Sequence, residues 1–147
     1  MRTKKYFIGF VIIVVLMVAG AANAAPPTSL GNLAGTWYNT QPGSGGIAKI
    51  VVTVSSGQIY VHAYGKCTPT YCDWGTVPGS AFSRSVGSSV AYGFIANYPN
   101  QSVGSTLITA VRKFDFDGGS YLEVQKRTTF RAGDTRYNYE NIEMFRK

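Results

Sequence analysis

Histidine and cysteine are scarce in this sequence, which holds one histidine, His62, and two cysteines, Cys67 and Cys72, among its 147 residues. Zinc sites prefer cysteines that lie closer together than these two, which four residues separate. A catalytic serine, threonine or cysteine would depend on His62 for its base. The sequence therefore predicts no metal site, no cofactor and no enzymatic activity.

Acidic residues are also few, with seven Asp and Glu against 14 Lys and Arg. Three of the basic residues, Arg2, Lys4 and Lys5, precede an apolar run that is too short for the roughly 20 residues a bilayer needs. That run ends at about Gly20, before the small-residue motif Ala22–Ala24. This order of features predicts a cleavable secretory signal peptide.

The signal peptide is expected to cover residues 1–24 and to leave a single domain at residues 25–147. The mature part keeps 11 Lys and Arg against seven Asp and Glu, a net charge of +4 without a basic cluster. That charge argues against nucleic acid as a partner, and cleavage removes any stable membrane insertion. A periplasmic or extracellular location permits oxidation, so a disulfide between Cys67 and Cys72 is expected.

Helical periodicity is missing from the mature part, whereas β-branched and aromatic runs bounded by turn residues recur along it. The expected strands are Thr36–Asn39, Ile47–Val54, Ile59–Lys66, Ala81–Val86, Val90–Asn97, Leu107–Phe116, Tyr121–Phe130 and Tyr137–Arg146. About eight strands with short connections predict an all-β antiparallel meander. A closed, calycin-like barrel is the favoured architecture, and a β-sandwich is the alternative.

The run Ile59–Lys66 has two different faces, because side chains alternate along a strand. Its odd-numbered residues are small and apolar, and its even-numbered residues are aromatic or polar. The sequence favours the apolar face as barrel core. It leaves open the reverse, in which the polar face lines a cavity.

The segment Gly35–Asn39, with the sequence GTWYN, resembles the first strand of avidin-type barrels and the Gly-x-Trp signature of lipocalins. The resemblance implies a barrel that holds a small ligand in its mouth. It implies that Trp37 packs at the closed end against a basic side chain of the last strand, for which Arg146 is the candidate. Asn39 would contact the ligand, although biotin is not expected in a chain with only two tryptophans.

A second segment, Gly65–Gly75, has the sequence GKCTPTYCDWG and resembles a group of small exported bacterial proteins of unassigned function. That resemblance extends over most of the mature part. It implies one exported β-barrel domain and brings no activity with it.

Tyrosine is abundant, with nine in the mature part, and its ring and hydroxyl suit contacts with proteins, sugars and polar ligands. The leading hypothesis is a binding protein for a small molecule or glycan, with a barrel mouth framed by the Cys67–Trp74 loop. The candidate ligand-binding residues are Asn39, Tyr60, His62, Tyr64, Tyr71 and Trp74.

Two other functions stay open. A protein-interaction module, such as a secreted inhibitor or surface component, would use an outward patch of Tyr60, Tyr64 and Tyr71 to bind an extracytoplasmic protein. A hydrolase would need two carboxylates, or His62 with an acid, to converge in one cleft.

Overall fold

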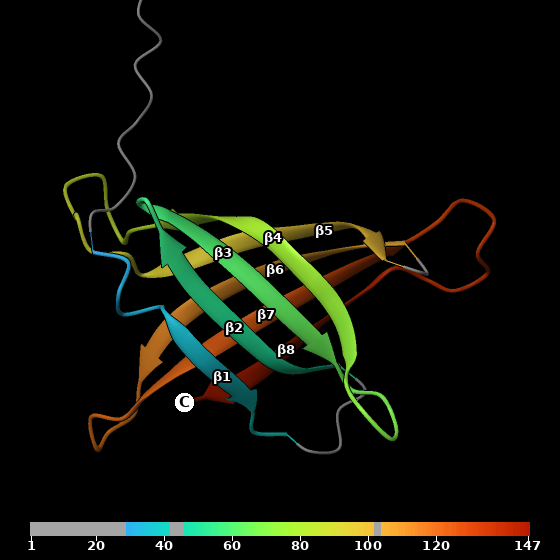
Figure 1. Cartoon of the computed structure of the whole chain (residues 1–147), viewed down its shortest axis with the longest axis horizontal. Coiled ribbons are helices and arrows are strands. Elements are labelled where there is room, and N and C mark those ends of the chain that lie inside the picture. The colour runs from blue at the N-terminus through green and yellow to red at the C-terminus, as the bar shows by residue number, and fades with distance from the viewer. Residues whose placement is uncertain (1–28, 42–45, 102–103) are drawn as a thin grey trace, which may run out of the picture.

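The computed structural model describes residues 29–41, 46–101 and 104–147, so the expected signal peptide at 1–24 lies outside the described residues. This part of the chain forms eight β-strands and no helix (Figure 1). The strands are β1 (Gly35–Asn39), β2 (Ile47–Ser55), β3 (Gln58–Gly65), β4 (Cys72–Phe82), β5 (Gly93–Gln101), β6 (Gly104–Phe114), β7 (Ser120–Phe130) and β8 (Tyr139–Arg146). The same part accordingly contains no helix that is suited to crossing a bilayer.

The strands close into a barrel in which each pairs antiparallel with the next one along the chain. The ring closes between β1 and β8, where Tyr38 pairs with Arg146 and Asn39 pairs with Phe145. The predicted eight-stranded meander barrel is confirmed, and the β-sandwich alternative is wrong. Among the described strands each has a neighbour on both sides, although β1 and β8 pair over two residues only.

The inner face of the barrel follows from the alternation of side chains along the strands. In β3, Ile59, Val61 and Ala63 are buried, whereas Tyr60, His62 and Tyr64 face outward. The expectation that the small apolar face of this strand forms core is therefore confirmed.

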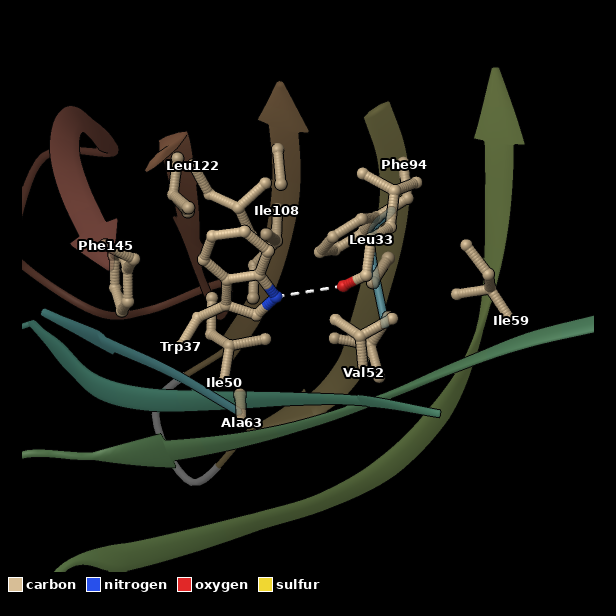
Figure 2. Close-up of a cluster of buried hydrophobic side chains, with 14 of the residues drawn as sticks. Leu33, Trp37, Ile50, Val52, Ile59, Ala63, Phe94, Ile108, Leu122 and Phe145 are labelled. Carbon is tan, nitrogen blue, oxygen red and sulfur yellow. Dashed lines mark hydrogen bonds between the residues drawn. The ribbon is translucent and has the colours of Figure 1, made fainter. Parts of the chain in front are cut away.

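The segment before β1 closes one end of the barrel around Trp37 (Figure 2). Leu30 and Leu33 are buried there, and the indole N–H of Trp37 donates a hydrogen bond of 2.9 Å to the Leu33 carbonyl. Lys147 lies over the indole, with Nζ 4.6 Å from the ring centroid, and donates to the Ala34 carbonyl at 2.6 Å. These contacts make this end the closed end of the barrel.

Arg146 does not take the place against Trp37 that the resemblance to lipocalins implied. Its side chain points to the other face of β8, where it pairs with Asp115 at 2.7 Å and lies 5.7 Å from the Tyr121 ring. Side chains alternate along a strand, so the cation beside the indole comes from the next residue, Lys147.

The fourth strand differs from its predicted position, because Cys72–Phe82 is extended where only Ala81–Val86 was expected. Gly75, Pro78 and Gly79 weakened the strand signal, since glycine and proline are depleted in strands. Close packing explains Gly79: a Cβ at this position would lie 2.8 Å from Cγ2 of Ile59.

Candidate functional site

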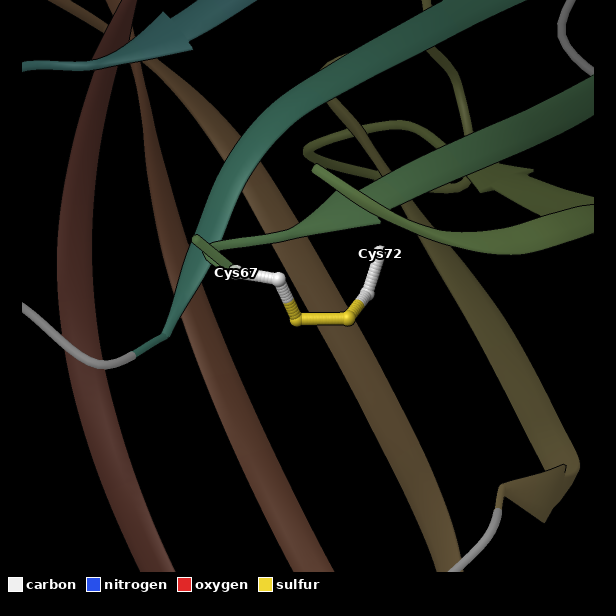
Figure 3. Close-up of a disulfide and its surroundings, with 2 residues drawn as sticks. All are labelled: Cys67 and Cys72. Carbon is white, nitrogen blue, oxygen red and sulfur yellow. A yellow bond between two sulfur atoms is a disulfide. The ribbon is translucent and has the colours of Figure 1, made fainter. Parts of the chain in front are cut away.

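The last residues of β1, β3, β5 and β7 and the first residues of β2, β4, β6 and β8 lie at the end of the barrel opposite Trp37, and we call this end the mouth (Figure 1). A disulfide between Cys67 and Cys72 closes the β3–β4 connection, with the two Cα atoms 5.5 Å apart (Figure 3). The predicted disulfide is confirmed. The predicted Cys67–Trp74 loop is shorter than expected, because Cys72 already belongs to β4.

A β-bulge follows the disulfide and directs Trp74 inward. His62 pairs with Thr76 and Tyr64 pairs with Asp73, so β4 has one residue more than β3 between these pairs. Gly75 adopts a φ of 78°, which favours glycine, and its N–H donates to Oδ1 of Asp73 at 2.7 Å.

The Trp74 indole packs against the core over the inner side of Gly65. A Cβ at Gly65 would lie 2.6 Å from its Nε1. Its ring meets the buried Tyr98 ring edge-on, with the two centroids 5.8 Å apart. The bulge therefore places a large aromatic side chain at the mouth.

Near the mouth, part of the inner surface of the barrel is polar. Four buried residues on the inward faces of β6, β7 and β8 are polar or charged: Thr106, Lys126, Thr128 and Glu143. The rest of the buried cluster consists of hydrophobic side chains. Polar side chains inside a barrel cost free energy unless they find partners, so each one requires an account.

Glu143 has partners for both carboxylate oxygens. Nδ2 of Asn39 donates to Oε2 at 3.1 Å, and Nδ2 of Asn141 donates to Oε1 at 2.8 Å. Asn39 also donates to the Ile47 carbonyl at 2.7 Å. Asn39, a predicted ligand residue, is therefore held at the mouth by the barrel itself.

Lys126 is different, because the residue is 3% exposed and its ammonium group forms no ion pair or hydrogen bond among the described residues, although Nζ is not one of the fully buried polar atoms. Nζ of Lys126 lies 5.4 Å from the centroid of the Tyr139 ring. Asn141 is its direct neighbour on β8, and Oδ1 of Asn141 is buried without a partner. A lysine without an ion pair and a buried amide oxygen without a partner thus occupy adjacent positions on the inner face.

Aromatic and hydroxyl side chains form a row across four strands above Lys126. Tyr98 pairs with Thr106, Thr106 with Thr128, and Thr128 with Tyr139. The Tyr98 hydroxyl donates to the Val61 carbonyl at 2.8 Å, and burial raises the pKa of this phenol, so it stays a donor at neutral pH. The row joins Trp74 on one side of the mouth to Tyr139 on the other.

The predicted ligand residues are therefore divided between two surfaces. Asn39 and Trp74 lie at the mouth, together with Lys126 and Asn141, which sequence reasoning missed. Tyr60, His62 and Tyr64 lie on the outer face of β3, and the exposed Tyr71 lies in the β3–β4 connection with its ring 5.7 Å from Nζ of Lys49.

On that outer face, His62 joins two polar side chains of β4. Nε2 of His62 lies 2.6 Å from Oδ1 of Asp73, and Oγ1 of Thr76 lies 3.0 Å from Nδ1. The Gly75 N–H and then His62 lower the pKa of Asp73. Thr76, His62 and Asp73 thus follow the order of a nucleophile, a base and an acid. Such a site also needs N–H donors for an oxyanion, and the N–H of the neighbouring Gly75 donates to Asp73 instead.

Stacked rings extend this outer surface. The rings of His62 and Tyr64 are stacked with centroids 4.3 Å apart, and Nζ of Lys49 lies 3.9 Å from the Tyr64 centroid. Tyr71 is 52% exposed and lies 5.7 Å from the same ammonium group. Throughout residues 29–41, 46–101 and 104–147, no group of three or more His, Cys, Asp and Glu side chains is placed to hold a metal ion.

The chain was also compared with known proteins. No family model, curated protein or solved structure matches it. The resemblances of Gly35–Asn39 and Gly65–Gly75 to known barrels and exported proteins therefore stay predictions, apart from the barrel itself, which belongs to the observed fold.

Proposed function

We propose that this protein is an exported, non-enzymatic binding protein that holds a small molecule or glycan in the barrel mouth. The observation that carries the proposal is Lys126, an inward-facing lysine of β7 whose ammonium group has no ion pair or hydrogen bond among the described residues. A ligand that brings a carboxylate or carbonyl oxygen supplies the charge-assisted hydrogen bond that the described residues do not give this ammonium group. The disulfide is compatible with export.

The neighbours of Lys126 define the ligand that fits. Oδ1 of Asn141 accepts a hydrogen bond from an N–H or O–H group, and the hydroxyls of Thr106 and Thr128 can donate or accept. Trp74 on β4 and Tyr139 on β8 supply aromatic rings at the mouth. A compact ligand with a carboxylate or carbonyl, several hydroxyl or amide groups and one flat or apolar side meets all of these groups.

Thermal unfolding of the mature protein with single ligands tests the proposal. Glucuronate and N-acetylglucosamine supply the acceptors and donors described above, and n-hexane-1,2-diol supplies hydroxyls alone. A ligand at a hundredfold excess over its Kd adds about 2.7 kcal/mol to the free energy of unfolding. At least one of the two sugars should raise Tm, and the Lys126→Met variant should lose that increase.

The matched control is Lys113→Met, which removes a half-exposed lysine whose Nζ lies 3.4 Å from Glu123. This variant should keep the full ligand effect. The proposal fails if neither sugar raises Tm, or if the Lys126→Met protein responds as strongly as the wild type.

A second candidate function is protein binding by the outer face, because Tyr60, Tyr64 and Tyr71 all face outward. Tyrosine is enriched in binding hot spots, and the ring faces here are held by Lys49 and His62. A Tyr60→Ser/Tyr71→Ser protein should then lose crosslinks to extracytoplasmic proteins that the wild type and the Lys126→Met variant both form. Unchanged crosslinks would remove this candidate.

A further inference from the structure

A concave site lies near the closed end, far from the mouth along the barrel. It is a pocket of about 310 Å³ between the β4–β5 connection and the end of β6. Its walls include two arginines, two aromatic rings, a serine and a valine: Arg84, Arg112, Tyr92, Phe114, Ser88 and Val90. The connection is fixed beside the closing segment, because Ser29 forms a parallel β-bridge with Val90.

Arg112 and Phe114 belong to the inward-facing row of β6, two and four residues after the buried Ala110. The row passes out of the packed core at this end, so these two side chains line a pocket. The guanidinium carbon of Arg112 lies 4.5 Å from the Phe114 ring centroid. Its Nε is inaccessible to solvent and has no hydrogen-bond partner, which is costly for a charged group.

Arg84 reaches the same pocket from the other side. Its guanidinium carbon lies 4.1 Å from the Tyr92 ring centroid. A guanidinium group that stacks on a ring keeps its N–H edge available, and this edge matches a carboxylate or phosphate with two parallel hydrogen bonds. Both arginines are therefore oriented by rings and not by carboxylates.

Charge pairing sets these two arginines apart. Arg127, Arg136 and Arg146 each lie 2.7 Å from a carboxylate oxygen. Within the part of the chain that the structure describes, neither Arg84 nor Arg112 has an acidic side chain within 4.0 Å. Two positive charges without counter-ions thus line one pocket, and the pocket attracts anions.

We propose that this pocket binds a small organic anion, with its oxyanion group between Arg84 and Arg112 and its apolar part against Val90 and Phe114. The volume fits a compound of modest size, since small-molecule sites begin at about 300 Å³. The mixture of guanidinium edges with exposed apolar walls favours an amphipathic anion over inorganic phosphate. This site does not depend on the function proposed for the mouth.

Isothermal titration of the mature protein with phenyl phosphate, octanoate, inorganic phosphate and the uncharged 1-octanol tests the proposal. Phenyl phosphate or octanoate should bind, and both inorganic phosphate and 1-octanol should bind at least about tenfold more weakly. Binding should weaken further as salt is added, because partly exposed charges are screened.

Variants locate the binding at this pocket. Arg84→Gln should weaken anion binding by about tenfold or more. Arg84→Lys should weaken it by less, since lysine keeps the positive charge but lacks the two parallel N–H donors of the guanidinium group. Arg127→Gln is the matched control on the outer face of β7 and should leave binding unchanged. Lys126→Met should also bind the anion normally, which separates this site from the mouth.

Arg112→Gln removes the second arginine of the pocket, which is half-buried. Amide hydrogen exchange of β6 shows whether that variant keeps its fold. The proposal is overturned if neither amphipathic anion binds at about 10 mM, if 1-octanol binds as well as octanoate, or if Arg84→Gln binds as the wild type does. Binding only to vesicles that contain phosphatidylglycerol would assign the arginines to a lipid surface and would also overturn it.

Discussion

Replacement of Lys126 by methionine should make the barrel more stable while it abolishes ligand binding at the mouth. Methionine has nearly the same length and shape, so it fills the space without a cavity. The variant removes the charge of a residue that is 3% exposed as a whole and whose ammonium group forms no ion pair or hydrogen bond in the described part of the chain. Most core substitutions destabilise, so a gain in stability is a distinctive result.

The expected gain follows from two opposing contributions. Replacement of a buried charge by a well-packed apolar side chain stabilises proteins by about 1–4 kcal/mol. The Tyr139 ring, 5.4 Å from Nζ, offsets about 0.5–1 kcal/mol of that gain through its attraction to the cation. We therefore expect the free energy of unfolding to rise by up to about 3 kcal/mol, with a Tm increase of up to about 10 °C.

Urea denaturation followed by circular dichroism measures this change, with the midpoint and the slope fitted separately. An unchanged slope shows that the native and unfolded states expose the same surface as before. A loss of stability of about 1 kcal/mol or more would refute the reasoning, because it would mean that the ammonium group is well satisfied inside the barrel.

Three further changes address other parts of the molecule. The Cys67→Ser/Cys72→Ser protein should lose about 2 kcal/mol of unfolding free energy in urea, since the disulfide closes a short loop. Asp73→Asn should lower Tm near neutral pH, and its difference from wild type should disappear as the pH falls below 3.8, because the fold lowers the pKa of this carboxyl and stabilises its charged form. Gly65→Ala should cost about 1–3 kcal/mol and shift tryptophan emission to longer wavelength, because its Cβ would displace Trp74.

The predictions for Gly65 and Asp73 can each be contradicted by a specific result. Gly87→Ala is the control for the glycine, because its Cβ meets no atom within 4 Å and should change stability by less than about 0.5 kcal/mol. Equal losses in Gly65→Ala and Gly87→Ala would mean that contact with the indole is unimportant. A pH-independent effect of Asp73→Asn would mean that charge at this position does not stabilise the fold.

The barrel was predictable because alternation between apolar and polar residues is strong in most strands. In β3 the small apolar residues and the aromatic residues separate cleanly, and short turns such as Ser56-Gly57 set the hairpins. The exception is β4, where Gly75, Pro78 and Gly79 serve the bulge and close packing and therefore conceal the strand.

The mouth was predictable only in part. Lys126 interrupts the alternating apolar row that Leu122 and Val124 begin in β7, and this signal was present in the sequence. The hydrogen bond between Asn39 and Glu143 could not be predicted from the sequence, because it depends on the pairing of the first and last strands, about a hundred residues apart. The division of tyrosines between inside and outside likewise required the register of each strand.

The seam between β1 and β8 has a mechanical consequence. These strands pair over only two residues of β1, Tyr38 and Asn39, whereas β6 and β7 pair along 11 residues. Local opening starts where a fold has the fewest hydrogen bonds, so the ring is expected to part first along this line. The hydrogen bond from Asn39 to Glu143 joins β1 to β8 inside the barrel. The polar side chains of the mouth therefore help to keep the two strands paired and the barrel closed.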